Sequence, residues 1–197
     1  MGQGHQVHPF GSIDTPFNPI SVALGAEATF VARTHDMDRQ HMMETFRRAH
    51  DHKGAAFVEI YQNCNVFNDG AFEPLTAKAN RADMLIPLVH GEQIRFGADL
   101  EKGVAMGTDG SLRIVDVAEV GEENILVHDE ANDRGLGFML SRLSHGPHEP
   151  TPIGVFRAVE HAEYGTEVSR QIAQAHERGG PQDIEALLHS GATWTVE

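Results

Sequence analysis

The fold class follows from the run ATFVARTHDMDRQHMMETFRRAHDHKGAAFVEIYQNC at residues 28–64. Residues 28–33 and 55–61 are short segments rich in β-branched and aromatic side chains, which predicts two strands. The segment between them, residues 36–50, has the apolar spacing of a helix. A strand, a helix and a second strand in so short a run predict a βαβ unit. Its strands should be parallel and joined by a right-handed crossover.

The helix predicted at residues 36–50 has an acidic cap at its start, either Asp36 or Asp38. Its apolar positions recur at helical spacing and are Met42, Met43, Phe46 and Ala49. We expect this face to pack into the core, with the methionines as filler.

Polar side chains follow both predicted strands. Arg33-Thr34-His35-Asp36 follows the first strand and Gln62-Asn63-Cys64 follows the second. Open sheets with parallel strands bind their ligands beyond the carboxyl ends of those strands. Cys64 is therefore predicted to lie at the position of a ligand-binding or catalytic site. The residues alone leave two interpretations of this cysteine, a small buried hydrophobe or a thiol with a chemical role.

The flanking sequence completes the expected organisation. A loop at residues 1–17 precedes a short helix, which Asn18 caps and Pro19 begins. Residues 74–83 form a link, after which strands are predicted at 84–89, 93–96, 103–107, 112–117, 125–128 and 153–159, and helices at 132–143, 166–178 and 181–190. We therefore expect an α/β domain with a parallel sheet over residues 1–80 and a smaller, strand-rich α+β extension over residues 81–197.

Composition excludes several classes of protein. The 197 residues carry a formal charge of −14, which argues against unaided binding of nucleic acid or of an anionic membrane. The sequence contains no run of eighteen apolar residues, so no membrane span is predicted. The single cysteine rules out an internal disulfide and fits a reducing, cytoplasmic location. The thirteen histidines are scattered, without a partner at zinc-ligand spacing, and are interpreted as surface residues.

Several groups of residues, in the order in which they stand, carry a resemblance to a known family. They are GSIDTPFNP at 11–19 running into ALGAEATFVAR at 23–33, HKG at 52–54 leading through FVEI at 57–60 to QNC at 62–64 and FNDG at 67–70, HGE at 90–92 with RFG at 95–97 and KG at 102–103, and finally LSRL at 140–143 and WTV at 194–196. Together they resemble the beta subunits of 2-oxoacid:ferredoxin oxidoreductases over nearly the whole chain. The tail with His90-Gly91-Glu92 and Trp194 is more similar to the 2-oxoglutarate branch than to the pyruvate branch.

The resemblance implies an enzyme that uses thiamine diphosphate, Mg²⁺ and a 4Fe–4S cluster. Such an enzyme oxidatively decarboxylates a 2-oxo acid, transfers the acyl group to coenzyme A and passes the electrons to ferredoxin, with an alpha subunit as partner. The family's cluster ligands are typically three early cysteines and a late one in a Gln-X-Cys context. Gln62-Asn63-Cys64 matches the late one, so Cys64 is the expected metal ligand.

Two motifs of the family are absent from this sequence. There is no Gly-Asp-Gly, which holds Mg²⁺ on the cofactor, and no Cys-X-X-Cys. Both normally lie upstream of the residues matched here, so the thiamine diphosphate site and the catalytic residues are expected outside this chain. The chain is therefore interpreted as a fragment, a truncated reading frame or half of a split subunit, inactive alone and completed by the missing amino-terminal part of the beta subunit.

Alternative interpretations make different structural predictions. A subunit fragment should expose an apolar surface where the missing part packs, whereas a non-catalytic assembly or scaffold protein derived from that subunit should bury Cys64 and expose no such patch. A thiamine diphosphate enzyme of the acetolactate synthase kind fits less well with Gln62-Asn63-Cys64 and the strand-rich tail. Arg33, at a strand end, is a candidate for binding the distal carboxylate of the substrate, although a surface ion pair is the commoner role of such an arginine.

Overall fold

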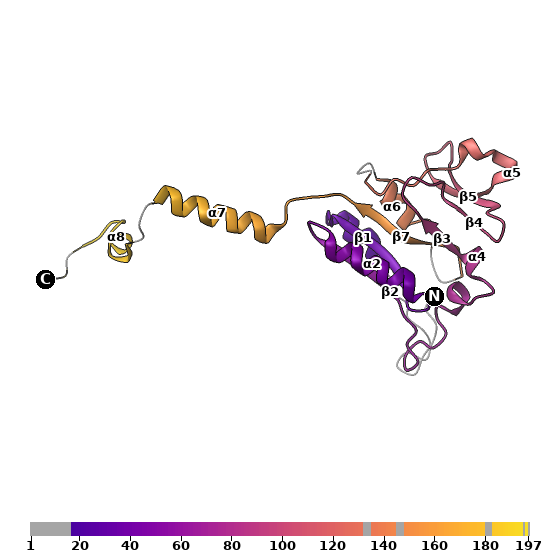
Figure 1. Ribbon diagram of the computed structural model, residues 1–197, viewed down its shortest axis with the longest axis horizontal. Coiled ribbons are helices and arrows are strands. Elements are labelled where there is room, and N and C mark those ends of the chain that lie inside the picture. The colour runs from indigo at the N-terminus through magenta and orange to yellow at the C-terminus, as the bar shows by residue number, and fades with distance from the viewer. Residues whose placement is uncertain (1–16, 132–134, 145–147, 180–182, 195, 197) are drawn as a thin grey trace. The chain divides into compact units, whose positions relative to one another are not determined.

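A mixed sheet of four strands forms the centre of the unit that ends at residue 161. The computed structural model describes residues 17–131, 135–144, 148–179, 183–194 and 196. The strand order is β2-β1-β7-β3 (Figure 1). The bounds are Phe30–His35 for β1, Ala56–Tyr61 for β2, Leu85–Leu88 for β3 and Thr151–Ala158 for β7. β1 is parallel to β2 and antiparallel to β7, and β7 is parallel to β3. The chain is therefore of the mixed α/β class, with a parallel pair of strands at one edge of the described sheet.

The predicted βαβ unit is confirmed. Helix α2 (Arg39–Asp51) connects the parallel strands β1 and β2 and packs against both. The Asp38 carboxylate accepts a hydrogen bond from the backbone N–H of His41 at 3.0 Å. Asp38 is thus the cap of this helix, and Asp36 serves another purpose described below.

The buried face of α2 differs from the predicted one. Thr45 is buried, whereas Met43 and Phe46 are 49% and 42% exposed. Ala49 packs against the small core cluster around Phe30, as expected. Helical spacing identifies residues that share a stripe, but it does not say which side of the helix the sheet covers. Here the sheet covers the side of Thr45 and Ala49, and the described residues leave Met43 and Phe46 about half exposed.

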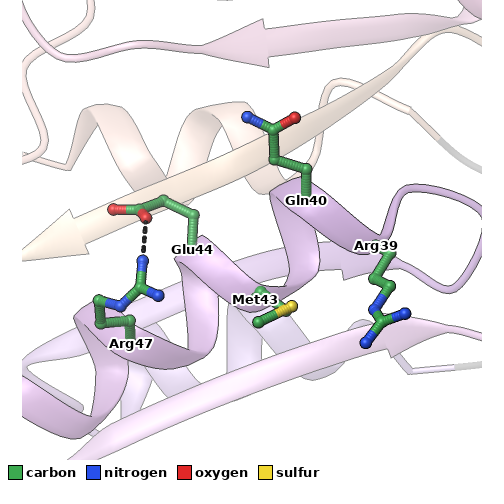
Figure 2. A pocket seen from close by; sticks show the side chains of 5 residues that line it. All are labelled: Arg39, Gln40, Met43, Glu44 and Arg47. Carbon is green, nitrogen blue, oxygen red and sulfur yellow. Dashed lines mark hydrogen bonds and ion pairs between the residues drawn. The ribbon is translucent and has the colours of Figure 1, made fainter.

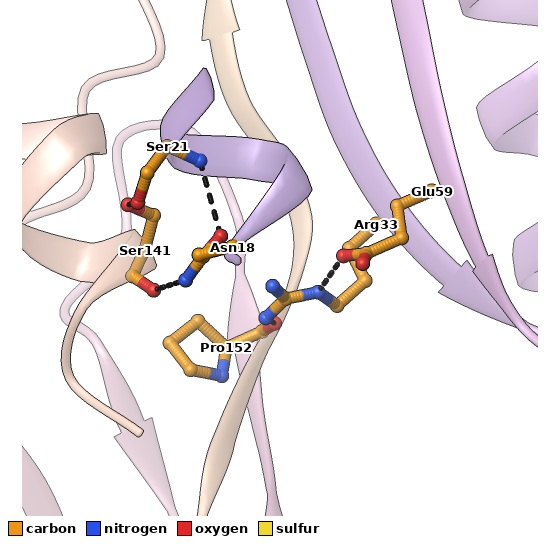
Figure 3. A network of polar contacts seen from close by, with 6 residues as sticks. All are labelled: Asn18, Ser21, Arg33, Glu59, Ser141 and Pro152. Carbon is orange, nitrogen blue, oxygen red and sulfur yellow. Dashed lines mark hydrogen bonds and ion pairs between the residues drawn. The ribbon is translucent and has the colours of Figure 1, made fainter. Parts of the chain in front are cut away.

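Helices α1 (Pro19–Gly25) and α6 (Leu136–Ser141) pack on each other and against the sheet. Asn18 caps α1 as predicted, accepting from the Ser21 backbone N–H at 3.0 Å, and its side-chain amide donates to the Ser141 carbonyl at 2.5 Å (Figure 3). The main core cluster consists of Ile20, Ala23, Leu24, Val31, Ile86, Leu88, Ile94, Phe96, Val104, Leu140 and Phe156. This core joins α1 and α6 to strands β1, β3 and β7.

A second, antiparallel sheet follows in the order β4-β5-β6. Its strands are Arg95–Phe96, Lys102–Met106 and Leu112–Asp116, and the last two form the predicted hairpin. The segment predicted as a strand at 125–128 makes only isolated bridges, at Ile125 and Val127. The predicted link at 74–83 contains parts of two short helices, α3 (Glu73–Thr76) and α4 (Arg81–Met84), and α5 (Val117–Val120) and a 3-10 turn (Glu122–Asn124) follow β6.

The chain separates into two compact units, with the division between residues 161 and 162. The second unit contains α7 (Tyr164–Gly179) and α8 (Ile184–Leu188), close to the helices predicted there. Residues 1–16 of the predicted loop and the start of the helix predicted at 132–143 lie outside the described residues. No helix within the described ranges is both long and apolar enough to cross a membrane.

The four-stranded sheet draws strands from both sides of residue 80. The division of the chain at that residue into a cofactor-binding part and an extension stays a prediction.

Candidate functional site

The carboxyl ends of β1 and β2 lie together, as their parallel pairing requires. The Asp36 backbone N–H donates to the Tyr61 carbonyl at 3.0 Å, which extends the ladder one residue beyond β1. Asp36, after β1, and Gln62-Asn63-Cys64, after β2, therefore share one edge of the sheet. That edge is the candidate site. The prediction was wrong for Arg33, Thr34 and His35, which are part of β1 and buried.

Asn63 fastens the loop that follows β2. Its backbone N–H donates to Asp36 Oδ2 at 3.0 Å, which ties the loop to the end of β1. Its side-chain amide donates to Asp69 Oδ1 at 2.9 Å, and its Oδ1 accepts from the Gly70 N–H at 2.9 Å. Gly70 has a φ of +73°, a conformation that glycine adopts without strain. Residues 63–70 thus form a closed loop whose shape is set from within and from β1.

Cys64 lies in this closed loop with its thiol exposed. The backbone N–H groups of Phe67 and, next in effect, Val66 point at the sulfur and lower the pKa of the Cys64 thiol below its usual value. The loop also turns back on itself, because the Asn68 N–H donates to the Cys64 carbonyl at 2.9 Å. Such a nest of N–H donors stabilises a thiolate, which is the form that acts as nucleophile and metal ligand.

The loop that contains Cys64 and the end of β2 also carry exposed apolar side chains. Val66 and Phe67 are 72% and 60% exposed, and Ile60 at the end of β2 is 41% exposed. β2 has one hydrogen-bonded neighbour in the described sheet, so its other backbone edge is open. The sequence of β2, with apolar residues on both faces, is typical of an inner strand. An exposed Cys64 beside an exposed apolar patch is what the subunit-fragment interpretation predicts, and it differs from the buried cysteine of the scaffold alternative.

Arg33 is buried and bound to neighbouring residues of the sheet. It is therefore neither free to bind a substrate nor part of a surface ion pair, the two roles considered for it from the sequence. Its Nε donates to Glu59 Oε2 at 2.6 Å, with side-chain exposures of 3% and 15% (Figure 3). Its Nη1 donates to the Pro152 carbonyl of β7 at 3.2 Å. The guanidinium also lies over the rings of Tyr61 and Phe156, 5.0 and 5.3 Å from their centroids. Arg33 therefore cross-links three strands inside the sheet.

Two histidines lie close to the end of β1. Thr34 Oγ1 and His41 Nδ1 are 2.8 Å apart, and burial lowers the pKa of His41. His35 is 2% exposed, so the prediction that the histidines are surface residues was wrong for it. Burial, followed by the charge of Arg81, lowers the pKa of His35. Both rings are held in the neutral form near pH 7. Within the described ranges, no group of three or more His, Cys, Asp and Glu side chains is arranged to hold a metal ion. Within these ranges Cys64 therefore belongs to no such group.

The outer surface of α2 has a shallow hollow of about 350 Å³, lined by Arg39, Gln40, Met43, Glu44 and Arg47. Figure 2 shows the Glu44 carboxylate turned toward the Arg47 guanidinium, 2.9 Å away, and both side chains are largely exposed. An open hollow with a solvated ion pair has none of the buried, convergent polar groups of a small-molecule site. It belongs to the same uncovered helix face as Phe46.

Sequence reasoning identified Cys64 and its strand end but missed the role of Asn63. The signal that could have found it is the Asn-Asp-Gly turn at residues 68–70, because a turn so close after the strand needs side chains to close the loop.

Both the sequence and the structure of the chain are similar to those of known proteins. No model of a protein family matches the chain. The 2-oxoglutarate oxidoreductase subunit KorB of Mycobacterium tuberculosis is 42% identical over 200 aligned residues, which cover 100% of this chain and 53% of KorB. The 2-oxoacid:ferredoxin oxidoreductase subunit beta of Saccharolobus solfataricus is 38% identical over 61 residues, 31% of this chain and 20% of that protein.

A solved structure agrees with the fold. It is the 2-oxoglutarate:ferredoxin oxidoreductase from Magnetococcus marinus with 2-oxoglutarate, coenzyme A and succinyl-CoA bound, with a TM-score of 0.59 and 19% identity over 97% of this chain and 50% of that chain. The chain thus spans about half the length of the mycobacterial relative and of the structural neighbour. The family that the sequence motifs suggested is confirmed by the similarity over the full chain. The chain belongs to the beta subunits of 2-oxoacid:ferredoxin oxidoreductases, of which it represents a carboxy-terminal part.

Proposed function

We propose that the chain works as the carboxy-terminal part of the beta subunit of a 2-oxoglutarate:ferredoxin oxidoreductase. In this reaction a 2-oxo acid loses carbon dioxide, coenzyme A takes up the acyl group, and ferredoxin accepts the electrons. The similarity to KorB along the entire chain is the observation that carries the proposal. Thiamine diphosphate and Mg²⁺ would bind to sequence outside this chain, because the Gly-Asp-Gly motif is absent from it. A cytoplasmic location fits its single, reduced cysteine.

Cys64 is proposed as one ligand of the 4Fe–4S cluster of the complete subunit. Three features support this role: the thiol is exposed, it lies at the carboxyl end of a parallel strand, and backbone N–H groups point at its sulfur. Hydrogen bonds to cluster sulfurs are among the features that set the reduction potential of such clusters. The closed loop of residues 63–70 would hold this ligand in place while the remaining ligands come from elsewhere.

The open edge of β2 and the uncovered side chains near it are proposed as the surface that receives the amino-terminal part of the beta subunit. Ile60, Phe67, Met43 and Phe46 are each at least 41% exposed. A strand of the amino-terminal part, added beside β2, would pair with its free backbone groups, and other elements of that part would cover these side chains. The alpha subunit and ferredoxin are the further proposed partners.

The test is a beta subunit rebuilt by joining this chain to the amino-terminal region of its mycobacterial relative. Cys64→Ser should lower the iron bound per subunit and abolish the electron paramagnetic resonance signal of the reduced cluster. Ser111→Ala, in a distant hairpin turn, is the matched control and should leave both unchanged. Unchanged iron content in Cys64→Ser would remove the ligand role.

The activity is tested separately. This chain alone, supplied with thiamine diphosphate, Mg²⁺ and coenzyme A, should release no carbon dioxide from 2-oxoglutarate, whereas the rebuilt subunit with an alpha subunit should. Decarboxylation by the isolated chain would contradict the proposal.

A further inference from the structure

Helix α7 carries an apolar stripe that the described residues of its own unit, residues 162–197, leave at least partly exposed. The stripe consists of Tyr164, Val168, Ile172, Ala175 and Gly179, which recur every three or four residues along the 16-residue helix. No described residue of α7 is buried, and Tyr164 and Ile172 are 84% and 53% exposed. A lone helix of this length is only marginally stable in water, so the stripe needs a cover.

The charge of this segment argues against a membrane as the cover. Residues 162–197 contain six acidic side chains and two arginines. Anionic lipid surfaces attract basic amphipathic helices and repel acidic ones. A protein surface is the better match.

Large side chains lie at the start of the stripe and small ones at its end. Two copies of the stripe that run in opposite directions would therefore place large side chains opposite small ones. If two copies of α7 lie antiparallel with Ile172 at the two-fold axis, Tyr164 of one copy faces Gly179 of the other, and Val168 faces Ala175. The largest side chain then lies opposite the residue without a side chain. Nothing lies within 4 Å of the position where a Cβ on Gly179 would sit, so room for the tyrosine ring exists there. Large residues facing small ones are the arrangement that lets two helices approach closely.

The charges beside the stripe agree with the same register. Glu167 directly precedes Val168 and Arg178 directly precedes Gly179, so both lie on the same flank of the stripe. In an antiparallel pair, equal flanks meet, and Glu167 of each copy lies opposite Arg178 of the other. Within its own helix Glu167 pairs with Arg170, whose Nε is 3.1 Å away. That exposed pair is weak, and one carboxylate oxygen remains for a second partner.

We propose that α7 is a self-association element that pairs antiparallel with α7 of a second copy of this chain, in the register centred on Ile172. The inference is independent of the proposed enzymatic function, because it uses only residues of the second unit. A helix of 16 residues is about 24 Å long, so this contact is smaller than a standard stable interface. We therefore expect self-association of the chain to be weak and dependent on its concentration.

Cysteine cross-linking in the full chain tests the register. In a Cys64→Ser background, Ile172→Cys should form a disulfide-linked dimer under mild oxidation. Ala173→Cys, one position farther around the helix, is the matched control. Pairing raises the effective concentration of the two thiols, so cross-linking at position 172 should be on the order of tenfold faster or more. Equal rates at the two positions would overturn the proposal.

The direction of pairing needs a second experiment, because parallel helices would also bring Ile172 next to its copy. A mixture of Val168→Cys and Ala175→Cys chains should yield the mixed dimer in preference to either homodimer. Preferential homodimers would show parallel pairing and refute the antiparallel arrangement. Likewise, a monomer in which the Ile172→Cys thiol is shielded from iodoacetamide would mean that the stripe docks on its own chain, which also refutes it.

The charges give an independent control. Glu167→Arg and Arg178→Glu should each raise the concentration needed for self-association in analytical ultracentrifugation, and the double variant should restore it. A double variant as weak as the single ones would count against the predicted Glu167–Arg178 contact and its register.

Discussion

At the scale of single residues, the environment of Cys64 makes a prediction about its reactivity. The N–H groups of Phe67 and Val66 lower the pKa of this thiol, so more of it is thiolate near neutral pH than in an unfolded chain. The rate of alkylation by iodoacetamide should therefore rise at lower pH in the folded chain than in the same chain in urea. Coinciding pH profiles would show that the loop does not stabilise the thiolate.

Asn63 supplies the matched pair of variants for this measurement. Asn63→Ala removes the side-chain contacts to Asp69 and Gly70, so the loop should loosen and the alkylation profile should move toward that of the unfolded chain. Gln62→Ala changes an exposed neighbour outside the closed loop and should leave the profile in place. An unmoved profile in Asn63→Ala would mean that the backbone alone sets the shape of the loop.

The ion pair of Arg33 and Glu59 predicts a large effect on stability. Glu59→Ala would leave the Arg33 charge buried without its partner, which costs roughly 3 kcal/mol or more of unfolding free energy. Glu44→Ala is the control, because it breaks the exposed pair with Arg47 and should cost about 0.5 kcal/mol or less. Urea denaturation of the two variants measures both values, and similar losses would contradict the structural role of the buried pair.

At the scale of secondary-structure elements, the packing of α6 on β7 depends on a glycine. A Cβ on Gly137 would lie 2.7 Å from the backbone oxygen of Phe156, and a strand backbone cannot easily yield. Gly137→Ala should push the helix from the sheet and cost roughly 1–3 kcal/mol.

The control for this change is Gly25→Ala at the end of α1, where a Cβ would meet no atom within 4 Å. That variant should change the unfolding free energy by about 0.5 kcal/mol or less. Thermal unfolding followed by circular dichroism compares the two, and an unaffected Gly137→Ala would show that α6 is free to move away from β7.

The elements that sequence predicted best are those that local pattern determines. The β1-α2-β2 unit, the helix that Asn18 caps and the hairpin of β5 and β6 all follow from spacing, caps and turn residues. For the same reason the strand-end position of Cys64 was predictable, because parallel strands bring their carboxyl ends to one edge.

The features that the sequence did not predict depend on contacts between residues that lie far apart along the chain. The insertion of β7 between β1 and β3 depends on antiparallel pairing with β1, whose residues lie more than a hundred positions earlier in the chain. The burial of Arg33 depends on Glu59 in the next strand and on Pro152 in β7. The exposure of Met43 and Phe46 could not be predicted either, because a hydrophobic stripe does not reveal which surface, if any, the chain itself provides to cover it.

At the scale of the whole molecule, the open edge of β2 predicts an uneven pattern of amide exchange. In a parallel ladder, successive amides of an edge strand point alternately toward the neighbouring strand and away from it. Every second amide of β2 should therefore exchange rapidly with solvent, whereas β1, which has neighbours on both sides, should be protected throughout. Hydrogen exchange read out by nuclear magnetic resonance distinguishes the two sets.

The same measurement on the rebuilt beta subunit tests the proposed surface for the amino-terminal part. The fast amides of β2 should become protected, while those of β6, at the edge of the other sheet, serve as the internal reference and should keep their rates. Unchanged exchange in β2 would mean that the amino-terminal part packs elsewhere.

The placement of β7 has a consequence for the order of events on the ribosome. Phe30 pairs with Ala158, so the central ladder of the sheet cannot close until most of the chain has left the exit tunnel. Until then β1 can pair only with β2 among the strands of this sheet, and apolar side chains of both strands stay exposed in the nascent chain. We therefore expect a long interval during synthesis in which ribosome-associated chaperones can bind these exposed apolar side chains. Pausing of translation before β7 should favour misassembly.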